Sequence, residues 1–246
     1  MAGGPAQRAQ RDWNAEALAQ SLRAAFAAHA DAKRAAPMQT YMKSDLPFYG
    51  IQAPLRRRLQ ATVFAAMPCR SGERLAEAML RLWRGATHRE ERYAAIELPD
   101  ARSHRRLLGL ECLPACEEMI RTGAWWDYCD AISAGAVAAL LRQDPAAMRP
   151  VLLRWACSGD LWLARASILC QRSMGPAADA HLLYRCILPS LDSPEFFLRK
   201  GIGWALRQRA RHAPDEVLAF CREYHTRLSP LTRREALRKL PVSPPR

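Results

Sequence analysis

Apolar residues recur along the chain at the three- and four-residue spacing of amphipathic helices, and no segment shows the alternation of a strand. Four segments open on a residue that can cap a helix, and three of these place proline directly after it: Asp144-Pro145, Ser193-Pro194, Ser229-Pro230 and Asp160. Breaks between helices are expected near residues 99–103, 142–145, 157–160, 174–177 and 212–215. The pattern predicts an all-α chain.

The C-terminal half has a rough period in the mid-thirties, with two helices in each unit. First helices are expected to begin near residues 125, 160 and 194, and second helices near residues 145, 177 and 214. Such pairs are typical of an α-solenoid of HEAT-like repeats, in which equivalent helices line one concave surface. The units share little sequence identity, so a non-repetitive helical bundle is the alternative. We expect the solenoid, with a concave basic groove.

The segment GAWWDYCDAISAGAVAALL, residues 123–141, contains a candidate site beside a core stripe. Each helical residue turns by about 100°, which predicts a core stripe of Trp125, Cys129, Ile132, Ala136 and Leu140. Trp126 and Asp130 lie one turn apart on a neighbouring arc. The alternative is an ordinary boundary tryptophan beside a solvated acid.

The next first helix, residues 160–174, places Arg165 among large apolar neighbours. An unpaired buried charge is costly, so this arginine needs an acid or a bound anion. If the units stack, Asp130 occupies the corresponding helix 35 residues earlier and is a plausible partner.

The third first helix, within SPEFFLRKGIGWALRQRAR at 193–211, has a core stripe of Leu198, Ile202, Ala205 and Leu206. Another arc collects aromatic, cationic and small residues, namely Phe197, Lys200, Gly201, Trp204, Arg207 and Gln208. Such a face suits close approach of a sugar-phosphate backbone. Packing between repeats with a cation–π contact is the alternative.

The chain of 246 residues has a formal net charge of +13, and lysine occurs only four times, so arginine dominates the positive charge. A polyanion such as nucleic acid is the partner that this charge favours. The alternative is a set of arginine-rich, solvated helix faces.

Cysteine usage and the chain ends indicate a reduced, cytoplasmic protein. The eight cysteines form no CxxC pair and the six histidines are scattered, so neither a metal nor a cofactor is expected. No run is long and apolar enough for a membrane span or signal peptide. We expect a disordered leader at 1–11, one domain at 12–240, a disordered tail at 241–246, and a monomer.

An acid in a basic groove repels phosphate, so it is expected to act on a cation. Spacing alone does not name a reaction, but hydrolysis of a glycosidic bond to a positively charged base would fit, because the departing base leaves an oxocarbenium-like sugar that a carboxylate can stabilise. Tryptophan faces would favour the cationic base and the sugar.

At these residues the sequence resembles the AlkD-type alkylpurine DNA glycosylases, the DNA alkylation repair family of HEAT-like repeats. The resemblance spans about residues 20–240 and rests on these stretches: YMKSDLPFYGI at 41–51, WWDYCD at 125–130, DLWLARASIL at 160–169, SPEFFLRKGIGWALRQRAR at 193–211 and LSPLTRREAL at 228–237. By this resemblance Trp126, Asp130 and Trp204 belong to the active site. The family arginine of a W-x-R-R pattern corresponds to Arg165, although Ala164 replaces the first arginine here.

The resemblance implies a monofunctional glycosylase that removes N3- and N7-alkylated purines, such as 3-methyladenine and 7-methylguanine, from duplex DNA without extruding the base. We expect Asp130, Trp126 and Trp204 to be catalytic. The side chains expected to contact DNA are Arg165, Lys200, Arg199, Arg207 and Lys43. The alternatives are a non-catalytic scaffold that binds DNA or branched DNA, and a helical repeat that binds acidic peptides.

Overall fold

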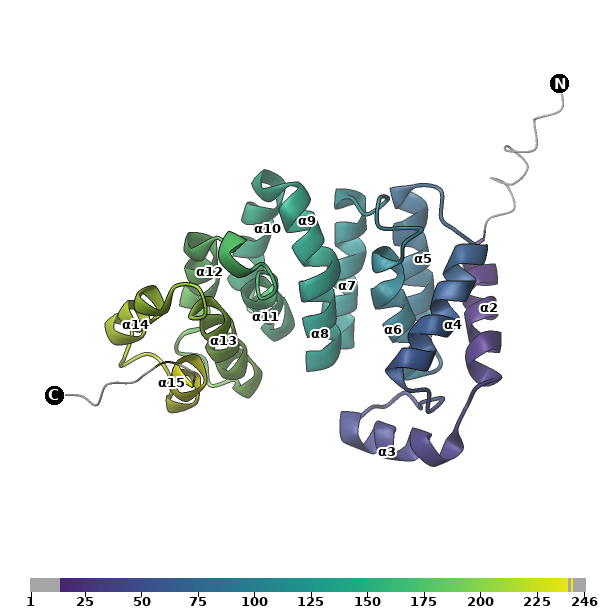
Figure 1. Cartoon of the computed structure of the whole chain (residues 1–246), viewed down its shortest axis with the longest axis horizontal. Coiled ribbons are helices and arrows are strands. Elements are labelled where there is room, and N and C mark those ends of the chain that lie inside the picture. The colour runs from purple at the N-terminus through teal and green to yellow at the C-terminus, as the bar shows by residue number, and fades with distance from the viewer. Residues whose placement is uncertain (1–13, 239, 241–246) are drawn as a thin grey trace, which may run out of the picture. The chain divides into compact units, whose positions relative to one another are not determined.

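The computed structural model describes residues 14–238 and residue 240, and all secondary structure in them is helical, as predicted (Figure 1). The expected leader and tail lie outside these residues. The α-helices are α2 (Ala15–Ala27), α3 (Ala32–Met42), α4 (Ala53–Ala66), α5 (Gly72–Arg84), α6 (Arg89–Glu97), α7 (Leu113–Gly123), α8 (Trp126–Ile132), α9 (Ala138–Gln143), α10 (Pro145–Ala156), α11 (Leu161–Leu169), α12 (Ala180–Ile187), α13 (Phe196–Arg209), α14 (Pro214–Glu223) and α15 (Pro230–Leu237). Short helices of other types are η1 (Leu98–Asp100), η2 (Leu110–Cys112), η3 (Ser133–Val137), η4 (Gly175–Ala177) and η5 (Leu188–Ser190).

Three of the four predicted capping residues cap helices in the structure. Asp144, Asp160 and Ser229 each accept hydrogen bonds from backbone N–H groups of the first turn of α10, α11 and α15. The fourth prediction is wrong, because α13 begins at Phe196 with Glu195 as its N-cap residue. The Ser193 hydroxyl instead accepts a hydrogen bond from the Glu195 N–H, so it closes a turn before the helix.

The chain forms two compact units, divided between residues 119 and 120. The first unit contains α2 to α6, and in Figure 1 α3 lies at one end of it, below α2 and α4. Its largest fully buried side chains include Phe26, Phe64 and Trp83. The expectation of one domain over residues 12–240 stays a prediction, as does the solenoid.

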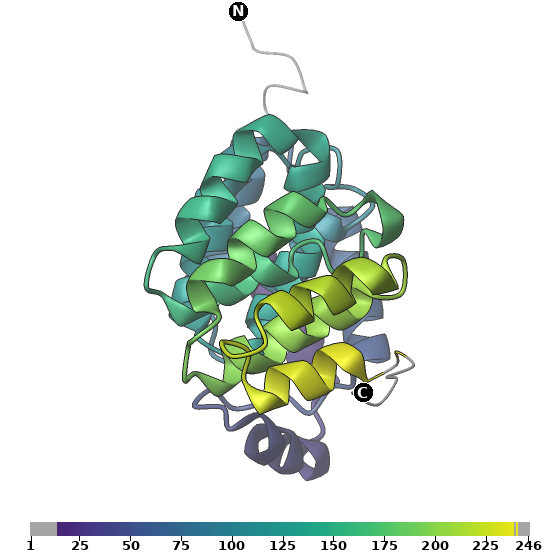
Figure 2. The same cartoon turned by 90° about the vertical axis from the view of Figure 1, so that its left-hand side faces the viewer.

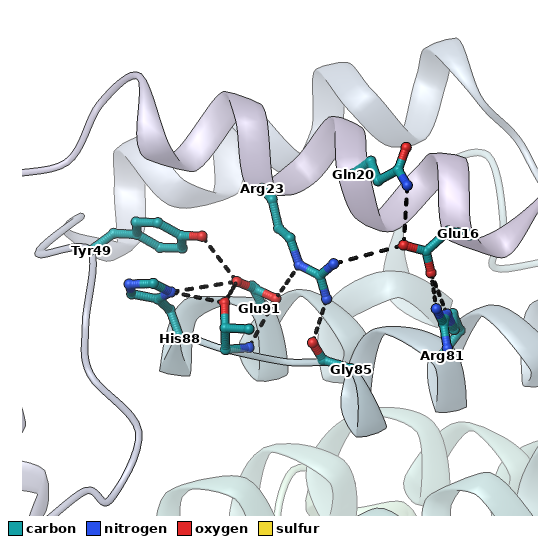
Figure 3. A network of polar contacts seen from close by, with 9 residues as sticks. Glu16, Gln20, Arg23, Tyr49, Arg81, Gly85, His88 and Glu91 are labelled. Carbon is teal, nitrogen blue, oxygen red and sulfur yellow. Dashed lines mark hydrogen bonds and ion pairs between the residues drawn. The ribbon is translucent and has the colours of Figure 1, made fainter.

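Two adjacent glutamates at the start of α6 hold the interior of the first unit together. The fully buried Glu90 accepts hydrogen bonds from the backbone N–H groups of Tyr49, Gly50 and Ile51. Glu91 accepts hydrogen bonds from Arg23 of α2 and from the Tyr49 hydroxyl, as Figure 3 shows. Every oxygen of the two buried carboxylates thus has a donor, which a buried charge requires.

The second unit contains α8 to α15. Its first helices begin at residues 126, 161 and 196, and its second helices at residues 145, 180 and 214, close to the predicted positions. Helices α13 and α15 lie side by side in this unit (Figure 2). No helix in the described part of the chain is long and apolar enough to cross a membrane.

The predicted core stripes of the second unit are confirmed with one exception. Cys129, Ile132, Ala136 and Leu140 are buried, as is the predicted stripe of α13. Trp125 is only half-buried, so its assignment to the core is wrong. It is the extended N-cap residue of α8, and its ring packs edge-on against Phe197 with the centroids 5.7 Å apart. The helix starts one residue too late for Trp125 to share its face.

Two glycines with left-handed backbone angles give a matched test of packing in the loops. Gly50 has a φ of +85°, and a Cβ there would lie 2.1 Å from the carbonyl oxygen of Asp31. Gly159 has a φ of +75° with nothing within 4 Å. We expect Gly159→Ala to lower the free energy of unfolding by about 1 kcal/mol through backbone strain alone. Gly50→Ala should cost about 3 kcal/mol or more, because a steric clash is added. Urea unfolding followed by circular dichroism measures both, and equal losses would contradict this packing.

Candidate active site

Helix α8 places Trp126 and Asp130 one turn apart, as the sequence predicts. The helix starts directly after Trp125, whose backbone is extended, and after Ala124, which has a φ of +42°. It passes at Ser133 into the π-helical turn η3. Such turns are frequent at functional sites. Trp126 is half-buried, whereas Asp130 is buried.

Asp130 and Arg165 form a buried, two-point ion pair. Arg165 Nε donates to Asp130 Oδ1 at 2.8 Å, and Nη2 donates to Oδ2 at 2.9 Å. The side chains are 5% and 10% exposed, for Arg165 and Asp130 respectively. Paired donors in this geometry fix the plane and the position of the carboxylate. The structure therefore contains the ion pair that the 35-residue spacing suggested.

Arg165 also connects the pair to a third helix. Its Nη1 donates to the carbonyl oxygen of Phe197, in the first turn of α13, at 2.5 Å. Gly201 leaves room for the guanidinium, because a Cβ there would lie 3.0 Å from Arg165 Nη1. The guanidinium is thus turned toward the protein, and this geometry makes Arg165 a partner of Asp130 rather than an exposed phosphate ligand.

Burial raises the pKa of Asp130 above the ordinary aspartate value, and its hydrogen bonds and charge interaction with Arg165 oppose that shift. Burial disfavours the ionised carboxylate, whereas a cation in direct contact favours it. A carboxylate with these two opposing influences has lost most of its water and keeps one fixed counter-ion.

Asp130 lines a pocket of about 410 Å³ in the second unit, together with side chains from α8, α11, α13 and α15. The lining residues are Trp126, Asp130, Arg165, Phe196, Phe197, Lys200, Trp204, Arg207 and Glu235. The pocket thus brings together the three predicted catalytic residues. It combines aromatic faces, cations and two carboxylates, and this composition suits a ligand that carries both phosphate and a positive centre.

The predicted DNA contacts do not all meet at this pocket. Lys200 and Arg207 line it, whereas Arg199 lines a different cavity and donates from Nε to the carbonyl oxygen of Ser193. Lys43 belongs to the first unit, where it is exposed and ends α3 in a left-handed conformation with a φ of +48°.

Sequence reasoning missed two charged residues at this site. Arg172 stacks on Trp204, with its guanidinium carbon 4.1 Å from the ring centroid. Burial lowers the pKa of Arg172, and the nearby Asp130 carboxylate opposes that shift. Glu235 lines the pocket from α15. The sequence could have indicated Glu235, because steps of 35 residues from Asp130 reach Arg165, then Lys200 and then Glu235.

Within the part of the chain that the structure describes, no three His, Cys, Asp or Glu residues gather closely enough to hold a metal ion. The side chains of the pocket can bind a phosphate through Lys200 and Arg207, and they present a carboxylate and indole faces to a cation.

Comparisons with known proteins show the family resemblance independently. The model of a family described as DNA alkylation repair enzyme matches residues 22–240. A solved structure described as a predicted DNA alkylation repair enzyme from Enterococcus faecalis is similar with a TM-score of 0.77 and 27% sequence identity. The similarity covers 87% of this chain and 98% of that chain. A search of curated proteins finds no match.

The ion pair predicts strong coupling between its two members. Arg165→Gln leaves Asp130 buried without its counter-ion, so we expect the free energy of unfolding to fall by about 3–5 kcal/mol. Adding Asp130→Asn removes the stranded charge, so the double variant should lose clearly less than the sum of the two single losses. Urea unfolding of all four proteins gives the coupling energy. Additive losses would show that the pair contributes nothing specific.

Proposed function

Because the chain belongs to the DNA alkylation repair enzyme family, we propose that it is a DNA glycosylase that hydrolyses the N-glycosidic bond of N3- and N7-alkylated purines in duplex DNA. The observation that carries this proposal is the buried Asp130 carboxylate, which Arg165 clamps inside a pocket lined by Trp126 and Trp204. An acid that served only to adjust the net charge of a DNA-binding surface would need neither burial nor two hydrogen bonds from one arginine.

In the proposed reaction the C1′–N bond of the alkylated purine breaks first. Its electron pair leaves with the base, which becomes neutral, and the sugar becomes an oxocarbenium ion. The Asp130 carboxylate stabilises this cation and orients the water that adds to C1′. That water loses its proton as the abasic sugar forms, and Asp130 can accept the proton. The overall change is hydrolysis to a free alkylpurine and an abasic site.

Trp126 and Trp204 are proposed to contact the deoxyribose and the positive charge of the lesion through their ring faces. A cationic purine is already a good leaving group, so no acid has to protonate it. The reaction can therefore be assisted from the sugar side alone, and we propose that the base is not extruded from the duplex. Lys200 and Arg207 would hold the adjacent backbone phosphate.

The remaining features of the chain support duplex DNA as the partner. The net charge of +13 favours a polyanion. Asp130, Arg165 and Trp204 come from α8, α11 and α13, which begin 35 residues apart. We propose that these are equivalent helices of HEAT-like repeats, and that they present one basic groove to the duplex.

The proposal predicts that Asp130→Asn abolishes most base release. We expect wild-type protein to release 7-methylguanine from a duplex with a single lesion faster than spontaneous loss. The variant should be slower by on the order of a hundredfold to a thousandfold, because the charge that stabilises the sugar cation is gone. Single-turnover kinetics at saturating protein measures this effect.

Asp192→Asn is the matched control, since it removes the same charge from an exposed carboxylate paired with Arg227 and should leave the rate unchanged. Equal release by wild type and Asp130→Asn would remove Asp130 from the reaction. Duplex binding without any release above background would favour the non-catalytic scaffold instead.

The burial of Asp130 predicts a specific pH dependence. Only the ionised carboxylate stabilises the sugar cation, so the enzyme-dependent rate should fall as pH drops through the pKa of Asp130. Burial raises that pKa, so the fall should begin above the pH at which an ordinary aspartate, with a pKa of about 3.9, becomes protonated. The single-turnover rate from about pH 4 to 8, after subtraction of spontaneous depurination, measures it. A corrected rate that rises toward acid would contradict the role of the carboxylate.

A further inference from the structure

Glu235 is a second carboxylate at the pocket, and the proposed reaction does not use it. It follows Lys200 by 35 residues, as Arg165 follows Asp130. It lies in LSPLTRREAL at 228–237, one of the stretches on which the family resemblance rests. The four charged side chains form two ion pairs of opposite order along the chain, Asp130 with Arg165 and Lys200 with Glu235.

Local sequence brings α15 close enough to α13 for this contact. Ser229 caps α15 and Pro230 occupies its first turn. Gly203 of α13 allows the approach, because a Cβ there would lie 2.6 Å from Glu235 Cβ and 2.9 Å from the Thr232 carbonyl oxygen. The Thr232 hydroxyl donates to the carbonyl oxygen of Arg199 at 3.1 Å, which ties the two helices together. Glu235 is therefore held by its backbone as well as by its charge.

Each oxygen of Glu235 accepts from a different cation. Oε1 accepts from Lys200 Nζ at 2.8 Å, and Oε2 accepts from Arg207 Nη1 at 2.6 Å. These hydrogen bonds, led by that from Lys200, hold the pKa of Glu235 below the ordinary glutamate value despite its burial. The carboxylate is thus ionised at neutral pH, with its side chain 11% exposed.

The two cations keep donors for a ligand. Lysine has three N–H donors and arginine has five, and Glu235 takes one from each. Lys200 is 41% exposed and Arg207 is 17% exposed, and both line the pocket with Asp130. A phosphate can therefore bind both cations while Glu235 holds them from α15.

We propose that Glu235 is a positioning residue, which fixes Lys200 and Arg207 so that a backbone phosphate docks at one distance from Asp130. This inference rests on the proposed function. An acid next to DNA weakens binding, so its benefit lies in the placement of the reacting sugar, where errors of about 1 Å can cost a hundredfold in rate. Removing Glu235 therefore has opposite effects on binding and on reaction.

The test compares Glu235→Gln with wild type in three measurements: binding to undamaged duplex at several salt concentrations, the single-turnover release rate at saturating protein, and the thermal unfolding midpoint. Binding should tighten severalfold, and the slope of log affinity against log salt should steepen by up to about one, because the net positive charge that faces the phosphate rises by one. The release rate should fall on the order of tenfold.

Two further variants separate positioning from charge and from folding. Glu235→Asp keeps the charge but is too short to reach both cations, so we expect the salt slope of wild type together with a reduced rate. Glu216→Gln is the matched control. Glu216 lies on α14 and pairs with Arg209, which is on α13 like Lys200 and Arg207, but Glu216 does not line the pocket. Its rate should equal that of wild type.

Three results would overturn the assignment. An unchanged release rate in Glu235→Gln shows that positioning is not needed. A wild-type rate in Glu235→Asp shows that only the charge matters. Weaker binding and a lower rate together, with a lower unfolding midpoint, show a purely structural role. Wild-type protein that releases no base refutes the proposed function itself, whereas release by wild type with any of these three results refutes only the role of Glu235.

Discussion

The architecture of the pocket depends on the cost of burying the Asp130 carboxylate. A charge that has lost its water is tolerated only beside a fixed counter-ion, and Arg165 supplies one from the next first helix along the chain. The third bond of that guanidinium, to Phe197, extends the constraint to α13. The Arg165 side chain thus joins α8, α11 and α13. The contacts that stabilise the second unit also hold the desolvated Asp130 carboxylate in a pocket with two tryptophans.

The pocket contains a second arrangement of this kind with the signs exchanged. Glu235 of α15 faces Lys200 and Arg207 of α13, as Arg165 of α11 faces Asp130 of α8. Glycines make both approaches possible, since Gly201 leaves room for Arg165 and Gly203 leaves room for α15. Asp130 and Arg165 are 35 residues apart, as are Lys200 and Glu235, so the same spacing along the chain brings an acid and a cation together twice. A site distributed over several helices can therefore arise from charges that also tie neighbouring helices of the second unit together.

The sequence predicted the parts of this arrangement that local rules decide. Helix starts follow from Asp144, Asp160 and Ser229, whose side chains cap within three residues, and the Asp130–Arg165 pair follows from the cost of a lone buried charge. Trp125 was misassigned because a one-residue shift in the start of α8 removes it from the helix face. Arg172 could not be foreseen, since it follows the end of α11 at Leu169 and its direction depends on the turn taken there. Glu235 could have been predicted from the 35-residue spacing, by one further step from Lys200.

The central claim is that Asp130 stabilises positive charge on the deoxyribose. Its most direct test is the affinity for two duplexes that differ only at one sugar, a cationic pyrrolidine in one and a neutral tetrahydrofuran in the other. A catalyst binds its transition state more tightly than its ground state, so wild-type protein should bind the cationic duplex on the order of a hundredfold more tightly, and Asp130→Asn should lose that preference. Equal affinity of wild-type protein for both duplexes, or a preference that survives Asp130→Asn, would contradict the claim.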